Sequence, residues 1–235
     1  MKKSGFQDRY SRNFNSISLE EQKKLKNSKV AVIGLGGLGG SVCEMLARVG
    51  IGSLILIDGD SFEPSNLNRQ ILSKEALMDF PKARAAKKRV NAINSQVNVS
   101  CFSEYLDKSN MYEYIKNVDL AVDCLDSIES RFFLQDAAKK ASIPVVAGAI
   151  AGMTGQVTAI FPGDTGYKAI YGERRGEGEK GVETITGNLV CCVFFVASLQ
   201  VSEVLKILLD RQEILRNKLL VSELWSNTFE IMDLI

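Results

Sequence analysis

The sequence predicts an α/β fold: a doubly wound, mostly parallel sheet continued by antiparallel strands, with a helical segment at the N-terminus. Up to about residue 150, short apolar segments alternate with helical ones, which is typical of parallel strands covered by helices on both faces. Beyond this point the pattern changes. Segments 156–161 and 218–232 resemble antiparallel strands, and a long apolar helix at 189–209 lies between them.

The elements of the first part follow from caps, glycines and apolar segments. Ser18 has capping-box spacing to a glutamate three residues later and opens a helix over 18–27. Residues 29–33 and 54–57 form apolar strands, and a glycine turn and a helix at 40–49 lie between them. The remaining alternation predicts helices at 82–94, 109–116 and 130–141, and strands at 97–102, 118–123 and 143–149.

The length of the chain and its cysteines indicate the number of domains and the cellular compartment. At about 100 to 200 residues per domain, the 235 residues predict a single domain over 1–235. Five cysteines without a C-x-x-C pair indicate reduced thiols, and the polar residues after Met1 show no secretory signal, so we expect a cytoplasmic protein. Polar side chains within 190–209 favour a buried helix over a membrane span.

The composition excludes several chemistries. The chain has no histidine, which excludes Ser-His-Asp and Cys-His catalysis and zinc sites built on imidazole. Any general base must therefore be a carboxylate or an amine. Because 29 Lys and Arg balance 28 Asp and Glu, the net charge of +1 also argues against a nucleic-acid protein held by bulk positive charge.

A G-x-G-x-x-G motif at Gly34, Gly36 and Gly39 lies between a strand and a helix, which makes the predicted fold Rossmann-like. Backbone N–H groups there can hold phosphate oxygens. Asp58 ends the next strand, at the position from which a carboxylate binds ribose hydroxyls. Alone, these residues indicate a nucleotide and favour NAD. The structural alternative is a tight turn that binds no ligand.

The residues after Asp58 are less typical of a dehydrogenase. Asp60 precedes a polar loop with Asn66, Asn68 and Arg69, and Lys82 opens the following helix. Two cations near a phosphate-binding turn favour a triphosphate. The structural alternatives are a surface ion pair for the arginine and a solvated helix start for the lysine.

Asp126 follows the strand at 118–123 and is expected at the carboxyl edge of the sheet, where ligands bind in open α/β folds. A carboxylate at this edge can hold Mg²⁺. The alternative is that Asp126 caps the helix at 130–141.

In order and spacing, seven segments resemble the MoeB/ThiF/HesA group of ubiquitin-activating-enzyme-like adenylyltransferases. They are Arg9 to Arg12, Val32 to Gly39, Ile57 to Asp60, Ser65 to Leu72, Pro81 with Lys82, Asp123 to Asp126 with Arg131, and Gly148 to Val157. These segments cover nearly the whole chain. Their combination is far more specific than the glycine motif alone.

The resemblance implies ATP and Mg²⁺ as cofactors, and as substrate the C-terminal Gly-Gly carboxylate of a ubiquitin-like sulfur carrier of the ThiS or MoaD type. The product would be an acyl-adenylate, with release of pyrophosphate, in thiamine, molybdopterin or related biosynthesis. The nucleotide-binding half would span about 28–150, and the carrier-binding and dimer half about 151–235. Because a carboxylate is already a nucleophile at neutral pH, alignment and charge neutralisation suffice.

The resemblance also assigns roles by position. The residues expected to bind the nucleotide are Gly34, Gly36, Gly37, Gly39, Asp58, Asp60, Ser65, Asn66, Asn68, Arg69, Gln70, Lys82, Asp126 and Ser127. Of these, Asp58 would hold the ribose, and Arg69 and Lys82 would contact the phosphates together with Asn66. Asp126 would position Mg²⁺.

Arg12 matches an arginine that family members contribute to the active site of the other subunit, so the resemblance implies a homodimer. With Arg69, Lys82 and Asp126 it completes the predicted catalytic set. No membrane partner is expected, and a nucleic-acid partner is disfavoured.

Several positions depart from the family pattern. Residues 168–171 occupy the place of a zinc-binding C-x-x-C, and a second pair is absent before Ile235, so we expect no zinc. The cysteine that some relatives use for a covalent intermediate falls near Glu183. Cys191 and Cys192 lie in an apolar helix start and are predicted to be core residues. Activation is thus supported and covalent sulfur transfer is not.

Segment 172–181, rich in glycine and charge, predicts a solvated loop. Alternatively, it guides the carrier's tail, with Arg174 and Arg175 contacting acidic groups. Ser127 stands where the family usually has Asn. Together with Asn68, it leaves open an enzyme that activates a threonylcarbamoyl carboxylate on tRNA. An NAD-binding oxidoreductase or sensor is the second alternative.

Overall fold

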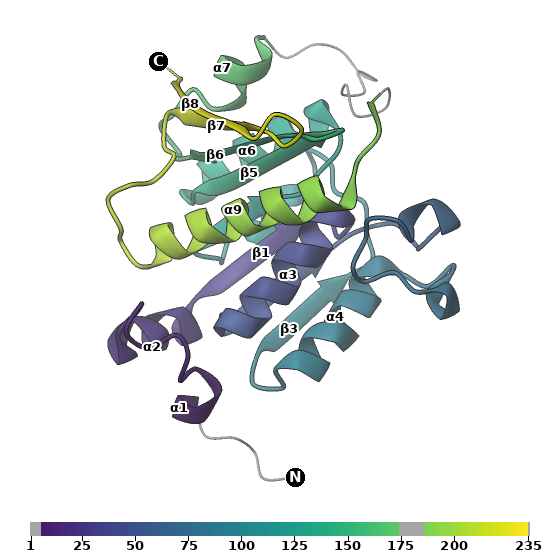
Figure 1. Ribbon diagram of the computed structural model, residues 1–235, viewed down its shortest axis with the longest axis vertical. Coiled ribbons are helices and arrows are strands. Elements are labelled where there is room, and N and C mark those ends of the chain that lie inside the picture. The colour runs from purple at the N-terminus through teal and green to yellow at the C-terminus, as the bar shows by residue number, and fades with distance from the viewer. Residues whose placement is uncertain (1–5, 174–185, 235) are drawn as a thin grey trace.

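The computed structural model describes residues 6–173 and 186–234. Its strands are β1 (Lys29–Ile33), β2 (Ser53–Ile57), β3 (Asn98–Phe102), β4 (Leu120–Asp123), β5 (Val145–Ala151), β6 (Thr154–Ile160), β7 (Lys218–Glu223) and β8 (Thr228–Asp233). They form one sheet in the order β3-β2-β1-β4-β5-β6-β7-β8. Pairing is parallel from β3 to β5 and antiparallel from β5 to β8, which confirms the predicted fold class (Figure 1).

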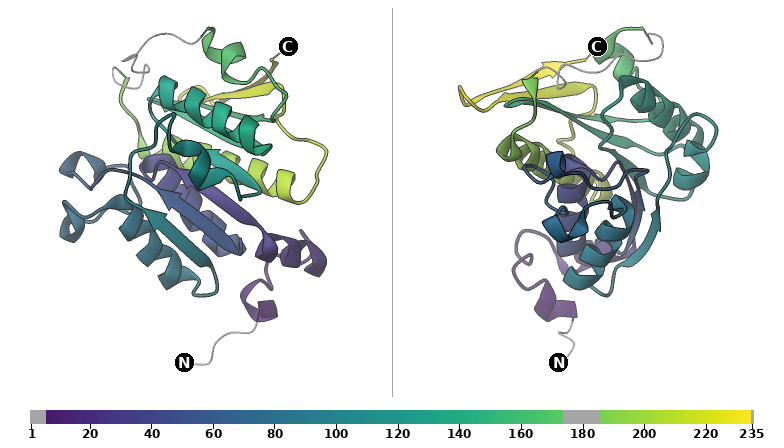
Figure 2. Two further views of the ribbon diagram at one scale, coloured as in Figure 1. Left: turned by 180° about the vertical axis from the view of Figure 1, so that it is seen from behind. Right: turned by 90° about the vertical axis from the view of Figure 1, so that its right-hand side faces the viewer.

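Helices cover both faces of this sheet. They are α1 (Phe6–Arg9), α2 (Leu19–Asn27), α3 (Gly37–Val49), α4 (Lys82–Ile93), α5 (Met111–Ile115), α6 (Ile128–Ala141), α7 (Tyr167–Tyr171) and α9 (Val190–Leu208), with short 3-10 turns at Pro64–Asn66 and Glu75–Leu77. Side chains of α3, α4 and α9 form one buried apolar cluster. Those of α5, α6 and α7 form a second cluster on the opposite face, which Figure 2 shows from behind.

Two helices begin earlier than predicted. α3 starts at Gly37 rather than at residue 40, because the glycines belong to its first turn. A Cβ on Gly39 would lie 1.8 Å from the carbonyl oxygen of Gly34, so this turn packs too closely against the strand for any side chain. α6 starts at Ile128 rather than at residue 130, with Ser127 as its N-cap. The capping box of α2 is confirmed.

The N-terminal segment packs at the amino end of the strands. Gln22 donates a hydrogen bond to the carbonyl of Val49 at 2.7 Å, and Arg9 donates one to the carbonyl of Ile93 at 2.9 Å. Both acceptors lie at the carboxyl ends of helices that run antiparallel to the neighbouring strands. Arg12, which is exposed, therefore lies at the end of the sheet opposite to the glycine turn.

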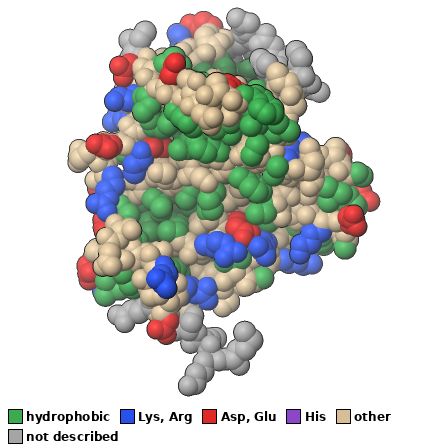
Figure 3. Space-filling view, in the orientation of Figure 1, with side chains coloured by type: hydrophobic (Ala, Val, Ile, Leu, Met, Phe, Trp, Pro, Cys, Tyr) green, Lys and Arg blue, Asp and Glu red, His purple; other side chains and the backbone are tan. Residues whose placement is uncertain are grey.

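By length and composition α9 could cross a membrane, although 44% of its most apolar window is buried within the protein. It packs against α3, β5 and β6. Two buried polar side chains bond within the fold: Gln200 donates to the carbonyl of Asp123, and Glu203 accepts from the N–H of Leu215, both at 2.8 Å. These bonds are those of a core helix, as predicted. Its outer face, including Phe194, is exposed, and Figure 3 shows apolar side chains gathered there.

Candidate functional site

A cavity of about 1010 Å³ lies at the carboxyl edge of the parallel strands. Its walls come from the loops after β1, β2 and β4, from the β5–β6 hairpin, and from residues just before α9. The chain leaves β1 toward β2 and β3, while β4 and β5 lie on its other side. Such a reversal of strand order opens a crevice where ligands bind in doubly wound folds.

The glycine turn forms one wall. Gly34 has φ +85°, and a Cβ there would lie 2.6 Å from the carbonyl oxygen of Cys124, so both its conformation and its contact require glycine. Gly36 caps α3 without a side-chain hydrogen bond, and Gly36 and Gly37 line the cavity. The free N–H groups of the first helical turn are therefore available to an anion.

Asp58 is fixed beside this turn. Its carboxylate accepts hydrogen bonds from the N–H of Leu35 at 2.6 Å and of Asp60 at 2.7 Å. Burial raises the pKa of Asp58, and the positive charge of Lys82 partly offsets this effect. A carboxylate held in this way at the cavity wall retains lone pairs that can accept hydrogen bonds from hydroxyl groups.

Lys82, Asp60 and Tyr105 form one hydrogen-bonded corner of the cavity. The ammonium of Lys82, a residue only 6% exposed, lies 2.8 Å from Asp60 Oδ2. The hydroxyl of Tyr105 donates to Asp60 Oδ1 at 2.7 Å. Partial burial acts to raise the pKa of Asp60, but the bonds from Lys82 and Tyr105 outweigh it and lower that pKa. The lysine is thus a buried, positioned cation rather than a solvated helix start.

The polar loop after Asp60 brings a second cation to the cavity. Buried Asn66 holds the turn together by accepting a hydrogen bond from the N–H of Glu63 at 3.1 Å. Arg69 donates from one guanidinium nitrogen to the carbonyl of Ser65 at 2.8 Å and to Asn68 Oδ1 at 3.1 Å. Within the described chain Arg69 has no carboxylate partner. Its remaining N–H groups can therefore meet a ligand.

Asp126 lines the cavity opposite these cations. The hydroxyl of Ser127, not Asp126, caps α6 by accepting from the N–H of Ser130 at 3.4 Å. Asp126 is exposed and, among residues 6–173 and 186–234, no hydrogen-bond or ion-pair partner of its carboxylate is found. A free carboxylate at a ligand cavity is available to a cation.

The donor set fits Mg²⁺ only as a nucleotide-bound ion. No group of three or more acidic or cysteine side chains that could hold a metal occurs in the part of the chain that the structure describes. Mg²⁺ at nucleotide sites usually takes one or two carboxylates from the protein and its other ligands from phosphates and water. The single carboxylate of Asp126 is sufficient for an ion bound in this way.

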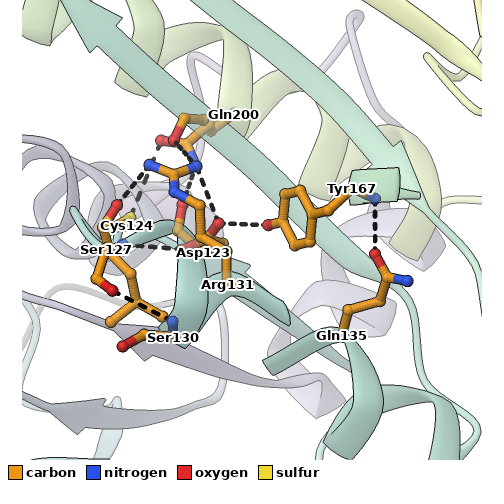
Figure 4. Close-up of polar contacts among 10 residues, drawn as sticks. Asp123, Cys124, Ser127, Ser130, Arg131, Gln135, Tyr167 and Gln200 are labelled. Carbon is orange, nitrogen blue, oxygen red and sulfur yellow. Dashed lines mark hydrogen bonds and ion pairs between the residues drawn. The ribbon is translucent and has the colours of Figure 1, made fainter. Parts of the chain in front are cut away.

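A buried ion pair fixes the loop that carries Asp126. Arg131 lies 3.1 Å from Asp123 Oδ2 and donates to the carbonyl of Gly148 at 3.0 Å. The hydroxyl of Tyr167 also donates to Asp123, as Figure 4 shows. Burial raises the pKa of Asp123, an effect that Arg131 partly offsets. This cluster joins β4, α6, β5 and α7 beneath the cavity.

Most of the residues predicted to bind the nucleotide are brought to this one cavity. They are Gly34, Gly36, Gly37, Asp58, Asp60, Ser65, Asn66, Arg69, Gln70, Lys82 and Asp126. Four predicted residues lie outside its walls: Arg12, Gly39, Asn68 and Ser127. Gly39 has a packing role, Ser127 a capping role, and Asn68 supports Arg69. Arg174, Arg175 and Glu183 lie outside the described residues.

The two adjacent cysteines differ from each other. Cys192 is buried, as predicted, but Cys191 is exposed, with its sulfur 3.4 Å from the sulfur of Met153. The prediction for Cys191 was wrong because nothing in the described chain covers the outer face of the first turn of α9. A third thiol, Cys124, lines the cavity, and burial raises its pKa. This thiol therefore stays protonated at neutral pH.

The structure connects three further residues to the site that no sequence motif indicates. Tyr105 holds Asp60, Tyr167 holds Asp123, and Asn188 lines the cavity just before α9. Tyrosines that follow a strand and an asparagine in a polar segment carry no pattern of their own. Only their partners, far away in the chain, show what they do.

Comparison with known proteins agrees with this geometry. Residues 10–234 match the model of the ThiF family. The chain belongs to the ThiF family. As a ThiF-family member it is 36% identical to the SAMP-activating enzyme E1 of Haloferax volcanii over 225 residues, which are 95% of this chain and 83% of that protein. It is also 36% identical to the sulfur carrier protein ThiS adenylyltransferase of Bacillus subtilis, over 93% of this chain and 66% of the relative.

Other relatives extend the comparison. The molybdopterin-synthase adenylyltransferase of Haemophilus influenzae is 37% identical over 64% of this chain and 63% of its own length. Among solved structures, E. coli MccB with ATP superposes with a TM-score of 0.84 at 25% identity, covering 97% of this chain and 72% of MccB. The predicted family, fold class and enzyme class, an adenylyltransferase, are confirmed. These relatives support ATP as the nucleotide.

Proposed function

We propose that this ThiF-family protein uses ATP to adenylate the C-terminal glycine carboxylate of a ubiquitin-like sulfur carrier. The observation that carries the proposal is the convergence, on one cavity, of an anion-binding helix start, two cations and a free carboxylate. The relatives named for ThiS and for molybdopterin synthase support a carrier as the substrate.

The reaction transfers AMP to a carboxylate oxygen. That oxygen attacks the α-phosphorus, the new O–P bond forms, and the bond to the oxygen that bridges to the β-phosphorus breaks. The electron pair leaves with pyrophosphate, so no proton moves and no general base is required. A protein without histidine can therefore catalyse it by alignment and charge neutralisation.

The residues at the cavity divide this work. Asp58 would accept hydrogen bonds from the ribose, and the N–H groups at the start of α3 would hold phosphate oxygens. Lys82 and Arg69 would neutralise the triphosphate and the departing pyrophosphate. Asp126 would hold Mg²⁺, which supplies further neutralisation of phosphate charge when bound.

We further propose a homodimer in which Arg12 acts in the cavity of the partner. Arg12 is exposed and does not line the cavity of its own chain. The exposed apolar side chains on one side of the fold, Leu67, Ile71 and Phe194 among them, offer a surface for a second copy, because large apolar groups on a surface favour association.

Complementation tests this arrangement. Arg12→Ala and Asp126→Ala are each expected to be inactive alone, whereas co-expressed subunits would form mixed dimers with one intact site. Random pairing makes about half of the dimers mixed, so such mixtures should recover about a quarter of the wild-type rate. Light scattering that shows a monomer, or mixtures without recovery, would contradict the dimer.

The main test is ATP–pyrophosphate exchange with ThiS of Bacillus subtilis as the carrier. Exchange should require the carrier's terminal glycine and fall by about 100- to 1000-fold in Asp126→Ala, as it does when one transition-state contact is removed. Asp233→Ala, a change at an exposed carboxylate on β8, is the matched control. Undiminished exchange in Asp126→Ala would overturn the site.

Thermal unfolding separates the remaining alternatives. Mg-ATP should raise the unfolding temperature, because a ligand that binds only the folded state stabilises it. Protection by NAD(H) without protection by Mg-ATP would instead favour an oxidoreductase or sensor. Filter binding of tRNA at physiological salt would reveal a tRNA-modifying enzyme.

A further inference from the structure

Two buried amide oxygens in the cavity have no hydrogen-bond partner. They are Gln70 Oε1 and Asn188 Oδ1, and they are the only such side-chain atoms among the described residues. Both residues line the cavity, and Gln70 is 6% exposed. A buried acceptor without a donor destabilises a fold, and native proteins rarely retain one without a ligand or water to satisfy it.

Both oxygens lie where the starts of α3 and α9 meet. The amide nitrogen of Gln70 is 3.6 Å from the point that a Cβ on Gly36 would occupy, and a Cβ on Gly37 would lie 3.0 Å from Val193 of α9. Asn188 immediately precedes α9 and forms a backbone bridge to Gly152 at the tip of the β5–β6 hairpin. The contact between the starts of α3 and α9 therefore places the two residues at neighbouring parts of the cavity wall.

The bridge holds Asn188 in place. The N–H of Gly152 donates to the carbonyl of Gly187 at 2.7 Å, and the N–H of Leu189 donates to the carbonyl of Gly152 at 3.3 Å. The backbone on both sides of Asn188 is thus tied to the hairpin, while its side-chain oxygen is left for another molecule. The fixed backbone therefore limits the positions that this oxygen can reach.

The chemistry of the two substrates decides which of them these acceptors suit. The donors of ATP are its ribose hydroxyls, which we assign to Asp58, and its adenine amino group. Its triphosphate oxygens are acceptors at neutral pH, so amide oxygens facing them would be repelled. A peptide chain presents one N–H donor per residue, and in a Gly-Gly tail no side chain hinders a close approach. Gln70 directly follows Arg69 in the segment after β2, but its unpaired oxygen, unlike a guanidinium, cannot donate a hydrogen bond to a phosphate.

We infer that Gln70 and Asn188 form a subsite for the substrate's C-terminal peptide, accepting hydrogen bonds from its backbone N–H groups. The inference rests on the proposed function and names the part of the cavity that the carrier tail occupies. It also moves Gln70 from the nucleotide, where the sequence motif placed it, to the peptide.

Kinetics of Gln70→Met and Asn188→Ala test the subsite. In pyrophosphate exchange with ThiS of Bacillus subtilis, each variant should raise the KM for the carrier about 5- to 10-fold, the effect of one lost hydrogen bond. The KM for ATP should stay within twofold. Gln96→Met and Asn98→Ala are matched controls, because both side chains are exposed and outside the cavity. An increase in the KM for ATP without one for the carrier would overturn the inference.

A substrate-side change tests the same contact in an unaltered protein. Semisynthetic ThiS with an ester oxygen in place of the N–H of its last peptide bond, or of the one before it, removes one donor. The wild type should bind one of these esters about 5- to 10-fold more weakly, and the variant without the matching acceptor should lose no more. Equal losses in wild type and both variants, the additive result of a double-mutant cycle, would overturn it.

Calorimetry keeps the two proposals apart. Wild-type protein that shows no exchange with the carrier would count against the proposed function. Titration of ThiS into wild type and the two variants, with Mg-ATP present, still reports tail binding. Unchanged carrier affinity in both variants would refute the subsite whatever the exchange assay shows.

Discussion

Asp123 and Asp60 are held by equivalent sets of partners in opposite environments. Each accepts hydrogen bonds from one cation and one tyrosine hydroxyl: Arg131 at 3.1 Å for Asp123, and Lys82 at 2.8 Å for Asp60. The Asp123 side chain is completely buried, whereas that of Asp60 is 49% exposed at the cavity. Burial therefore raises the pKa of Asp123, while the partners of Asp60 outweigh its partial burial and lower its pKa.

The difference separates a cluster that stabilises the fold from one that lies at the proposed nucleotide site. The Asp123 cluster joins four elements, and its buried carboxylate is engaged by Arg131, by Tyr167 and by the N–H of Leu125, so it stabilises the fold. The Asp60 cluster instead holds a cation at the cavity wall, where a phosphate can approach it. Similar partners thus stabilise the fold in one place and hold a cation at the cavity in the other, and the two carboxylates differ in burial.

The largest expected effect is the loss of the buried pair. Arg131→Met would leave the Asp123 carboxylate buried and without its cation, and breaking a buried pair in this way costs about 3 to 5 kcal/mol. Urea denaturation should show this loss in the free energy of unfolding. Lys23→Met is the control, because Lys23 and its partner Glu20 are both more than half exposed. Similar losses in both variants would contradict a special role for burial.

In the Asp60 cluster, Lys82→Met should affect activity much more than stability. Loss of the cation is expected to reduce exchange about 100- to 1000-fold, because a preorganised charge next to the reacting phosphates is removed. The free energy of unfolding should fall by less than in Arg131→Met, since the half-exposed Asp60 remains solvated, while the partly buried Asp58 loses the positive charge that offsets its desolvation. Lys88→Met, on the same helix and over the ring of Phe80, controls for loss of a lysine outside the cavity.

The two tyrosines allow a crossed comparison with smaller effects. Tyr167→Phe removes a buried hydrogen bond to Asp123 and should lower the free energy of unfolding by about 1 to 3 kcal/mol. Tyr105→Phe removes a bond on an exposed residue that lies over Gly59, so stability should hardly change. The KM of Tyr105→Phe for ATP should rise by only about two- to fivefold. The rise is small because Lys82 keeps its pairing to Asp60.

Stability and exchange kinetics of both tyrosine variants give four values. The comparison predicts that each variant changes one property and spares the other. If Tyr105→Phe destabilised the protein as much as Tyr167→Phe, the cavity cluster would be structural as well.

The sequence predicts the backbone of this site better than its polar partners. The strand at 29–33 has its predicted bounds, since a continuous apolar segment between polar ends is a local signal. Motifs also place Asp58 and Lys82 at the cavity, because a strand end and a helix start mark them in the sequence. Tyr105 and Tyr167 could not be found in this way, because they bond to carboxylates 45 and 44 positions away.

Predictions also failed where tertiary packing decides. Cys191 and Cys192 have the same apolar neighbours along the chain, yet only the second faces the core. The helix at Tyr167–Tyr171 was not predicted. It is a single short turn, and its buried tyrosine is held by partners on other elements.

The smallest expected effect is a difference in pH dependence. Asp60 has a lowered pKa in the folded state, so its contribution to stability is fully present above the unfolded value of about 3.9. That contribution is lost as the pH falls through the lower folded pKa. Asp123, with a raised folded pKa, acts in the opposite sense. Its contribution is greatest below about 3.9 and declines as the pH rises through its folded pKa.

Carbon-13 NMR of the side-chain carboxyls reads both groups in the wild-type protein, without any substitution. The Asp60 carboxyl should titrate below, and the Asp123 carboxyl above, the ordinary value of about 3.9. Unfolding free energies should agree: the wild-type advantage over Asp60→Asn should be constant from pH 7 to about 4 and shrink below it. If both carboxyls titrated on the same side of the ordinary value, burial would not be what separates the two clusters. In that case the difference would come from the strength of the bonds that Arg131 and Lys82 donate to the carboxylates. Lys82→Arg would test this explanation, because it should shift the titration of Asp60 and leave that of Asp123 unchanged.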